Sequence, residues 1–347
     1  MALIHLVVQP QGVAILQQTN VPIITVLIPV YSEQEALRLL LPRLDHALVK
    51  APPDAARWRI LLVNDGDLDS PLDGEPTGPF ERIESIEVLS LSRNLGHQRA
   101  IAIGLAELQN QAESNAVVVM DGDGEDDPED VPRLLQALEA AAYRKVVFAE
   151  RRKRSEGVMF WMGYHLYRHL HRLLTGVAVR FGNFSIIPKD LLDQLVCADE
   201  LWNHYAASVV KLRLPITLVP TARAPRLAGN ARMNTVALVV HGLSAMSVFS
   251  DRIGVRLLFV TMGCGVLVLG LIFAAVGVRF LTTLAIAGWA TYTTGILLLL
   301  LGQLGVACLL FAFMTLSGRT MVRFLPKRDY VHYIRNRTRV YPADEGR

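Results

Sequence analysis

The fold is decided by one stretch of sequence, Val117-Val118-Val119-Met120-Asp121-Gly122-Asp123-Gly124-Glu125-Asp126-Asp127-Pro128-Glu129-Asp130. It opens with a β-branched run typical of a buried strand and continues as a cluster of acidic residues. An apolar helical pattern then resumes at Val131, Leu134, Leu135 and Leu138. The stretch therefore predicts a strand that feeds a loop rich in oxygen ligands.

Two carboxylates, Asp121 and Asp123, follow this predicted strand directly. Carboxylates that share a site repel one another, so both turn to one point only where a positive charge is present. A hard divalent cation such as Mg²⁺ or Mn²⁺ is the natural occupant, because it needs few protein ligands and bridges to substrate phosphates. The alternative is an acidic, solvated helix start, which the helix dipole favours and which suits Glu129 and Asp130 better than the rest.

Three earlier segments also have the pattern of strands that end in polar loops. They are Ile23–Ile28 before Pro29-Val30-Tyr31-Ser32-Glu33, Arg59–Val63 before Asn64-Asp65-Gly66-Asp67, and Ile86–Leu91 before Ser92-Arg93-Asn94-Leu95-Gly96-His97. Helical patterns alternate with these strands, so the sequence predicts an α/β fold with a mostly parallel, Rossmann-like sheet. Ligands of such sheets bind beyond the carboxyl ends of the strands, where all four polar loops are expected to meet.

Sequence signals for helices lie between the predicted strands. Ser32-Glu33-Gln34-Glu35 has the form of a capping box, and Pro42 is expected to kink the helix that follows or break it early. A Gly-containing turn, Phe181-Gly182-Asn183-Phe184-Ser185, precedes another strand and helix. Thr235–Phe249 has apolar residues at helical spacing and is expected to lie along a bilayer.

Two further segments allow two interpretations each. Val146–Ala149 predicts a fifth strand, and the basic run after it, Glu150-Arg151-Arg152-Lys153-Arg154, suits either a diphosphate or a solvated patch at a membrane surface. The aromatic and basic residues of Phe160–Arg172 suit a helix in a membrane interface or a plain surface helix.

The hydrophobic excess lies near the C-terminus. The chain has 347 residues, of which 52% are hydrophobic. Leu257–Val278 contains 22 residues without a charge between Arg256 and Arg279, which is enough to span a bilayer. A second uncharged segment predicts a span from about Thr294 to Leu316 after a Thr-rich hairpin loop. Basic residues cluster at the ends of the two spans that lie away from the Thr-rich loop. We therefore expect a multi-pass protein of the inner or plasma membrane with the N-terminal part and both termini in the cytoplasm.

Charge and cysteine content narrow the class of protein. The net charge of +3 gives no support for a nucleic-acid partner. The surplus of Lys and Arg after residue 318 suits anionic lipid headgroups. Three cysteines, Cys197, Cys264 and Cys308, have no metal-like spacing and predict no disulfide framework. Met1–Asn20 lacks the pattern of a signal peptide and is expected to be a tail or a leading strand.

Five stretches together resemble family-two glycosyltransferases, in particular the membrane-anchored group that includes dolichyl- and undecaprenyl-phosphate sugar synthases. They are Pro29–Glu33, Asn64–Asp67, Ser92–Gln98, Met120–Glu129 and Arg226–Met233. The resemblance runs from about Val21 to Leu316 and is densest between Ile23 and Arg154. It is specific for the family but not for the sugar.

The resemblance implies a nucleotide-binding domain of the GT-A type and a set of site residues. It implies that the donor nucleotide is bound by Pro29, Tyr31, Glu33, Asp65, Arg93 and His97. Asp121 and Asp123 would be the Asp-x-Asp pair that shares a divalent metal with the donor diphosphate, and Glu125, where relatives carry Gln, would be a third ligand. Arg151 and Arg154 match basic positions associated with phosphate binding.

Several positions depart from the family pattern. Asn64 and Ser32 replace an expected Asp and Asn, which bears on nucleotide preference. Asn183 stands where many relatives have Asp, and Arg232-Met233 replaces a Lys-Tyr pair, which bears on the acceptor. With two spans and no Gln-x-x-Arg-Trp motif, the chain does not resemble a processive polysaccharide synthase.

We therefore expect an inverting, metal-dependent transfer of sugar from a nucleotide-sugar to a membrane lipid. A polyprenyl phosphate is already anionic, whereas a hydroxyl acceptor requires a general base. Candidates for that base are Asp199, Glu200, Asp126 and Asp127, although Asp199 and Glu200 also suit a helix start. The rival hypotheses are a hydroxyl acceptor, an inactive nucleotide-sugar-binding scaffold, and a nucleotidyltransferase, for which no Walker-type loop is present.

The expected organisation has five parts. They are a tail over residues 1–20, a cytoplasmic GT-A domain over 21–231, an interfacial helix over 232–253, a two-helix transmembrane hairpin over 254–318, and a basic cytoplasmic tail over 319–347. The expected partners are the nucleotide-sugar, the lipid acceptor, anionic headgroups and a second copy of the chain.

Overall fold

The computed structural model describes residues 4–5, 17–18, 21–52, 55–67, 71–72, 78–151, 168–177, 181–228, 235–282, 286, 288–320 and 324–342. Arg154 and most of the basic run that contains it lie outside these residues, as does most of the expected tail over 1–20. The chain divides into two compact units. Unit 1 comprises Met1–Ser155, Val179–Val239 and Phe324–Arg347, and unit 2 comprises Glu156–Ala178 and Val240–Arg323.

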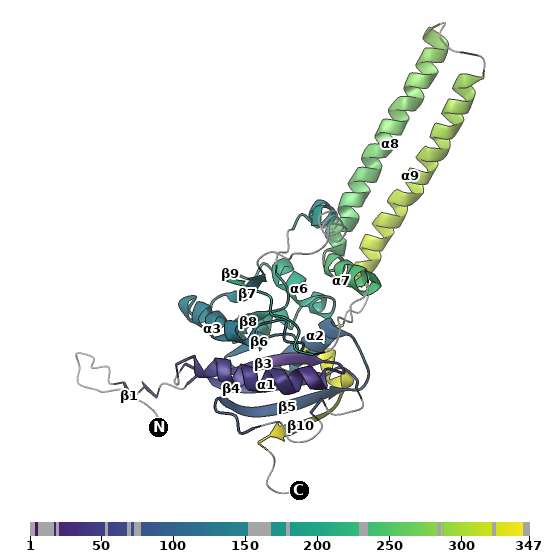
Figure 1. Ribbon diagram of the computed structural model, residues 1–347. Coiled ribbons are helices and arrows are strands. Elements are labelled where there is room, and N and C mark those ends of the chain that lie inside the picture. Colours follow the sequence, from purple (N-terminus) through teal and green to yellow (C-terminus); the bar gives the residue numbers. More distant parts are fainter. Residues whose placement is uncertain are drawn as a thin grey trace. The chain divides into compact units, whose positions relative to one another are not determined.

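Unit 1 is built on an eight-stranded sheet with the strand order β10-β5-β4-β3-β6-β8-β7-β9 (Figure 1). Its strands are β3 (Ile23–Val30), β4 (Arg57–Asn64), β5 (Ile83–Leu91), β6 (Ala116–Val119), β7 (Val146–Arg151), β8 (Ser185–Pro188), β9 (Ile216–Thr221) and β10 (Ile334–Tyr341). A separate two-stranded sheet pairs β1 (Ile4–His5) with β2 (Gln17–Gln18).

The central strands β5, β4, β3 and β6 are parallel neighbours, so their carboxyl ends meet at one edge of the sheet. β8 is antiparallel to both β6 and β7, and β10 is antiparallel to β5. The predicted α/β fold with a mostly parallel sheet is therefore confirmed, although the sheet as a whole is mixed.

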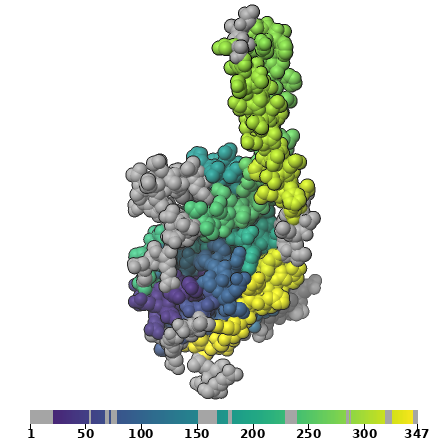
Figure 2. All heavy atoms as spheres, turned by 90° about the vertical axis from the view of Figure 1, so that its right-hand side faces the viewer, coloured from purple at the N-terminus to yellow at the C-terminus, as the bar shows by residue number. Residues whose placement is uncertain are grey.

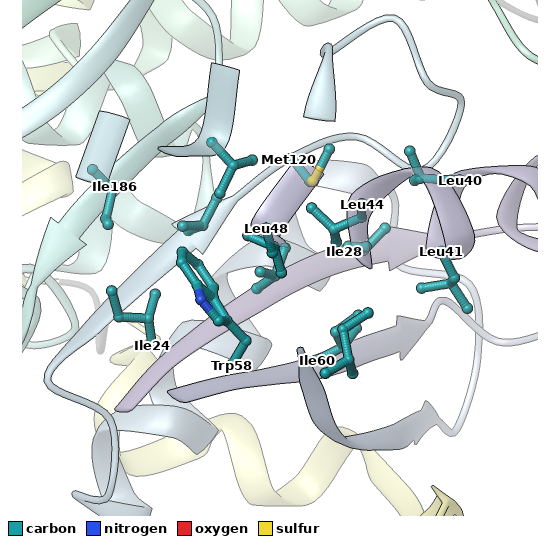
Figure 3. Packing of buried hydrophobic residues seen from close by; sticks show 14 of the residues in the cluster. Ile24, Ile28, Leu40, Leu41, Leu44, Leu48, Trp58, Ile60, Met120 and Ile186 are labelled. Carbon is teal, nitrogen blue, oxygen red and sulfur yellow. The ribbon is translucent and has the colours of Figure 1, made fainter. Parts of the chain in front are cut away.

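Helices cover both faces of the sheet. They are α1 (Gln34–Val49), α2 (His97–Gln111), α3 (Val131–Ala140), α5 (Lys189–Leu195) and α6 (Tyr205–Lys211), with short 3-10 turns η1 (Pro128–Asp130) and η2 (Asp199–Trp202). Alternate residues of β3 enter two separate cores, with Ile24 and Ile28 on the α1 side and Leu27 on the α2 side. Figure 3 shows the first core, in which Trp58 and Leu48 pack beside them. α1 runs unbroken through Pro42, so the expected early break is wrong.

The C-terminal segment is not the tail that the sequence predicts over 319–347. Residues 326–341 form α10 (Pro326–Asp329), η3 (Tyr330–Tyr333) and β10, and β10 completes one edge of the sheet against β5 (Figure 2, where the segment is yellow). Phe324 and Tyr333 stack around Trp202, with ring centroids 3.8 Å and 5.4 Å from it. The alternating basic residues of β10 look solvated in sequence but have acidic partners on β5 and α2.

Those partners remove much of the free positive charge expected for lipid headgroups. Arg337 pairs with Glu87 and lies 2.9 Å from Glu107. Arg339 lies 3.4 Å from Glu87, and Arg328 lies 2.6 Å from Asp329. The strand is thus held by side-chain charges as well as by its ladder of backbone hydrogen bonds.

Unit 2 is dominated by two long apolar helices that run side by side, α8 (Ser250–Leu281) and α9 (Trp289–Thr320) (Figure 1). Both are long and apolar enough to cross a membrane, and none of the most apolar window of α9 is buried within the protein. α7 (Thr235–Ser247) precedes them, close to the expected interfacial helix. Two apolar helices therefore lie where the sequence predicts them, although α8 starts before Leu257 and α9 starts before Thr294.

Candidate functional site

The loops after β4 and β5, at the carboxyl edge of the sheet, pack closely and hydrogen-bond to each other. Gly66 has a φ of +80°, and a Cβ on it would lie 2.1 Å from the backbone of Arg93 and Asn94, so only glycine is tolerated there. The carboxylate of Asp65 accepts hydrogen bonds from the N–H groups of Leu95 and Gly96 at 2.7 Å and 2.8 Å. Burial raises the pKa of Asp65, and these N–H donors partly offset it. Asp65 therefore shapes the loop that carries Arg93 and His97.

The acidic loop after β6 is held in shape by three of its own carboxylates. Asp126 is 2% exposed and accepts the N–H of Asp121 at 3.0 Å. Asp127 caps η1 by accepting the N–H of Glu129 at 3.1 Å. Asp123 accepts the N–H of Glu125 at 2.9 Å. Asp126 and Asp127, two candidates for a general base, thus have structural hydrogen bonds of their own.

A segment from far along the chain covers the acidic loop. The N–H of Leu227 donates to the carbonyl of Asp123 at 3.0 Å, and that of Ala224 donates to Glu125 at 3.1 Å. Gly124 permits this approach, because a Cβ on it would lie 2.4 Å from Leu227.

The same segment brings two arginines onto the carboxylates. Arg226 lies 2.6 Å from Asp123 and 3.8 Å from Glu125, and Arg223 also pairs with Glu125. The sequence reasoning did not select Arg223 or Arg226 as site residues, although their Pro/Gly/Arg loop offered the opposite charge to the acidic cluster.

His97, the first residue of α2, links the acidic loop to the loop before β8. Its Nε2 lies 3.2 Å from Oδ1 of Asp121 and 3.1 Å from the amide nitrogen of Asn183. Gln98 donates to Asn183 at 3.2 Å and accepts the N–H of Tyr205 at 2.8 Å. Partial burial favours the neutral imidazole, but Asp121 and the nearby Glu33 and Asp126 outweigh it and raise the pKa of His97.

Glu33 faces the acidic loop from the end of β3. A Cβ on Gly122 would lie 3.1 Å from its carboxylate, which shows how closely the two loops pack. Burial, followed by the negative charge of Asp123, raises the pKa of Glu33 to about 7. Burial also raises the pKa of Asp123; the N–H of Glu125 partly offsets this, and the charges of Asp121 and Glu125 raise it further. Burial and the neighbouring carboxylates therefore both favour the protonated forms of Glu33 and Asp123.

The remaining predicted residues lie on β3 or just after it, on β7 and on η2. Pro29 lies within β3, and Tyr31, 47% exposed, follows its end. Arg151 is the last residue of β7. Asp199 and Glu200 lie in η2, where Glu200 forms an ion pair with Lys211 at 2.9 Å. The four polar loops are thus brought together as predicted, whereas Glu200 is engaged in an ion pair of its own.

The donor set fits a hard divalent cation. Asp121 and Asp123 supply carboxylate oxygens. Burial raises the pKa of Asp123, the charges of Asp121 and Glu125 raise it further, and a cation would relieve that repulsion. Within the described part of the chain, no three His, Cys, Asp or Glu side chains are grouped as a ready-made metal site. A cation here would therefore complete its coordination with water and substrate oxygens, as Mg²⁺ usually does.

Comparison with known families agrees with this arrangement. Residues 25–196 match the family model described as Glycosyl transferase family 2. The chain is 25% identical over 297 residues to the uncharacterized glycosyltransferase YkcC of Bacillus subtilis (strain 168), across 81% of this chain and 87% of that protein.

Two named transferases match over a shorter region. The dodecaprenyl-phosphate galacturonate synthase of Rhizobium johnstonii is 28% identical over 125 residues, which are 35% of each chain. The undecaprenyl-phosphate 4-deoxy-4-formamido-L-arabinose transferase of Serratia proteamaculans is 33% identical over 116 residues, which are 33% of each chain. The match thus covers about a third of the length of these two relatives.

Among solved structures, the glucosyl-3-phosphoglycerate synthase from Mycobacterium tuberculosis, in complex with Mn²⁺, UDP-glucose and phosphoglyceric acid, has a TM-score of 0.47. It is 14% identical, across 67% of this chain and 80% of that one. A likeness this distant transfers neither ligand nor residue role to the present chain.

Proposed function

Because residues 25–196 form a domain of glycosyl transferase family 2, and the chain is therefore a glycosyltransferase, we propose that it transfers a sugar from a nucleotide-sugar to a polyprenyl phosphate in the membrane. The transfer inverts the anomeric carbon and depends on a divalent metal. One observation carries the proposal: Asp121, Asp123, Glu33, His97 and Arg226 converge at the carboxyl edge of parallel strands.

The donor diphosphate would be bound beside the acidic loop. Asp121 and Asp123 would hold the metal ion, which, when bound, supplies positive charge to the diphosphate oxygens. Arg226 and Arg223 add positive charge from the covering segment, and guanidinium groups fork onto phosphate oxygens as they do onto carboxylates. In the structure these arginines pair with Asp123 and Glu125.

The reaction is a single displacement. An acceptor oxygen forms the new bond to the anomeric carbon, while the bond from that carbon to the diphosphate oxygen breaks and the nucleoside diphosphate leaves with the electron pair. The residues around the acidic loop lower the barrier by stabilising the negative charge that develops on the leaving group. His97 orients Asp121 through the 3.2 Å contact between them.

A phosphate acceptor is favoured over a hydroxyl because it needs no proton removed. A hydroxyl needs a general base, and three of the four candidates already have other partners: Glu200 pairs with Lys211, Asp126 binds the N–H of Asp121, and Asp127 caps η1. The names of the two lipid-phosphate relatives support the same choice. A hydroxyl acceptor remains the alternative, and product analysis distinguishes the two.

The acceptor is expected to reside in the bilayer that α8 and α9 cross. Arg252 and Arg256 lie near the start of α8 and Arg319 near the end of α9, whereas the opposite ends of the two helices carry only Arg279, near the end of α8. The positive-inside rule then orients the catalytic domain and both termini toward the cytoplasm.

The test uses purified full-length protein, a panel of sugar nucleotides with Mn²⁺, and undecaprenyl phosphate. We expect release of nucleoside diphosphate with formation of a lipid-linked sugar, and at least a 100-fold loss in Asp123→Asn, of the order found when transition-state charge is left unstabilised. Glu139→Gln, an exposed carboxylate on α3, is the matched control. Metal-dependent nucleotide binding without product across lipid and hydroxyl acceptors would instead identify an inactive scaffold.

A further inference from the structure

An open pocket of about 330 Å³ lies where α8 begins and α9 ends, within unit 2. It is lined by Asp251, Arg252, Val255, Arg256 and Thr315. The two helices touch beside it, because a Cβ on Gly254 would lie 2.5 Å from the hydroxyl oxygen of Thr315. The pocket is therefore fixed by a close helix crossing.

The charge of this lining is positive, since two arginines face one aspartate. The guanidinium of Arg252 lies 5.6 Å from the ring of Phe249, which is fully buried. Arg256 donates to the carbonyl of Leu173 at 2.6 Å, and its side chain packs against Gly176. These contacts position the guanidinium groups of Arg252 and Arg256 from one side. Because a guanidinium has five N–H donors, each still presents further donors to the pocket.

The depth of the pocket follows from the sequence of α8. Leu257–Val278 contains 22 uncharged residues between Arg256 and Arg279. At helical rise they extend about 33 Å, close to the roughly 30 Å of a bilayer's hydrocarbon core. In a membrane, Arg256 and the pocket therefore lie at the level of the lipid phosphates.

We infer that this pocket binds the phosphate group of a membrane lipid, with Arg252 and Arg256 contacting its oxygens. Arginine forks onto phosphate, and few other anions are abundant at that depth. Thr315 forms the wall rather than a donor, because its hydroxyl donates to the carbonyl of Phe311 at 2.8 Å. Two arginines that only anchored α8 at the membrane surface would not need to line the same pocket.

The lipid has two possible sources with the same chemistry, a polyprenyl phosphate and an anionic phospholipid. Phosphate binding at the pocket does not depend on the proposed function; only the identification of the bound lipid as the acceptor rests on it.

The experiment measures lipid binding to the full-length protein by native mass spectrometry in detergent. The ligands are undecaprenyl phosphate, undecaprenol, dioleoyl phosphatidylglycerol and dioleoylglycerol, so that each phosphate lipid has a phosphate-free counterpart. We expect Arg252→Gln and Arg256→Gln each to weaken binding of the phosphate lipids at least ten-fold. Arg252→Lys should lie between wild type and Arg252→Gln, and Arg279→Gln, at the other end of α8, should bind as wild type does.

The outcomes separate cleanly. Tighter binding of undecaprenyl phosphate than of phosphatidylglycerol supports the site and identifies it with the acceptor, whereas equal binding supports a phospholipid headgroup site. Wild-type affinity in both glutamine variants overturns the inference, as does equal binding of the phosphate-free lipids. Because Arg256 also contacts Leu173, Arg252→Gln with an unchanged melting temperature is the decisive variant. A protein that binds the phosphate lipids through these arginines but never releases nucleoside diphosphate would refute the proposed function. It would still support the lipid-phosphate site in the pocket.

Discussion

The guanidinium of Arg226 lies 2.6 Å from the carboxylate of Asp123, although 103 positions of sequence separate the two residues. The contact joins the segment after β9 to the loop after β6, and two backbone hydrogen bonds run beside it. The arginine therefore neutralises Asp123 and lies where it could also contact a diphosphate bound beside the acidic loop.

Replacing Arg226 tests that dual role. Arg226→Gln should lower turnover of the sugar nucleotide about 10- to 100-fold, because charge on the leaving group loses a stabilising partner. Arg226→Lys should recover only part of the loss, since lysine lacks the planar fork. Steady-state kinetics with Arg144→Gln, an exposed arginine before β7, as control would measure the effect. Wild-type kinetics in Arg226→Gln would exclude a role in transfer.

Metal binding should be measurable apart from turnover. After treatment with a chelator, Mn²⁺ together with a nucleoside diphosphate should raise the melting temperature of the full-length protein, because a ligand that binds only the folded state stabilises it. The same mixture should have little effect on Asp121→Asn. An equal rise in that variant would show that the cation binds elsewhere.

Glu33 should make the metal-free protein less stable as the pH rises. The pKa of this carboxyl is about 7 in the folded protein against 4.5 for its ordinary value. Between these values the folded state holds a proton that the unfolded state has lost, so stability falls as pH rises through this window and stays lower above it. Glu33→Gln should remove this fall.

After allowance for the partial exposure of Glu33, the difference between wild type and Glu33→Gln should reach about 1 kcal/mol above pH 7. Denaturant unfolding at pH 4.5 and pH 8 in a chelator measures it, with the exposed Glu35→Gln as control. If Glu33→Gln is no more stable than wild type at pH 8, the pKa of Glu33 is not raised in the folded protein.

Gly66 should be indispensable to the paired loops after β4 and β5. In Gly66→Ala the new methyl group would lie 2.1 Å from the backbone of the neighbouring loop, at a φ of +80°. We expect a loss of about 2–4 kcal/mol from combined overpacking and backbone strain. Thermal unfolding of Gly182→Ala, whose Cβ would meet nothing within 4 Å, provides the comparison. Equal melting temperatures for the two variants would contradict the packing described.

Arg337 should contribute to the attachment of β10. Its guanidinium contacts Glu87, Glu107 and Gln111, so Arg337→Ala leaves a cluster of acidic and polar groups without their cation. We expect a loss of about 1 kcal/mol, as for a partly exposed charge network. Arg335→Ala, whose described contact is a 3.4 Å hydrogen bond to the carbonyl of Asp67, should cost less. A larger loss in Arg335→Ala would reverse the assignment.

The central strands and their loops were predictable because their signals are local. β3 to β6 are short apolar runs, and each polar loop follows its strand directly, so the carboxyl-edge rule was enough to bring Glu33, Asp65, His97 and Asp121 together. In the structure His97 and Asp121 lie 3.2 Å apart, as this rule leads one to expect.

Long-range pairing was not predictable in the same way. Arg226 has no local feature that points to Asp123, and the alternating arginines of β10 resemble a solvated tail until Glu87 and Glu107 are seen opposite them. Asp126 was interpreted as a possible base because the sequence cannot show that its carboxylate binds the N–H of Asp121.

The position of β10 in the chain also governs how the protein is made. β10, the strand that covers β5, follows both apolar helices in the sequence, so the sheet cannot close at this edge until α8 and α9 have been synthesised. Until then β5 presents an unpaired edge, which is the surface that chaperones and aggregating neighbours recognise. The edge of the sheet at β5 is therefore covered only by a segment that follows both apolar helices in the sequence.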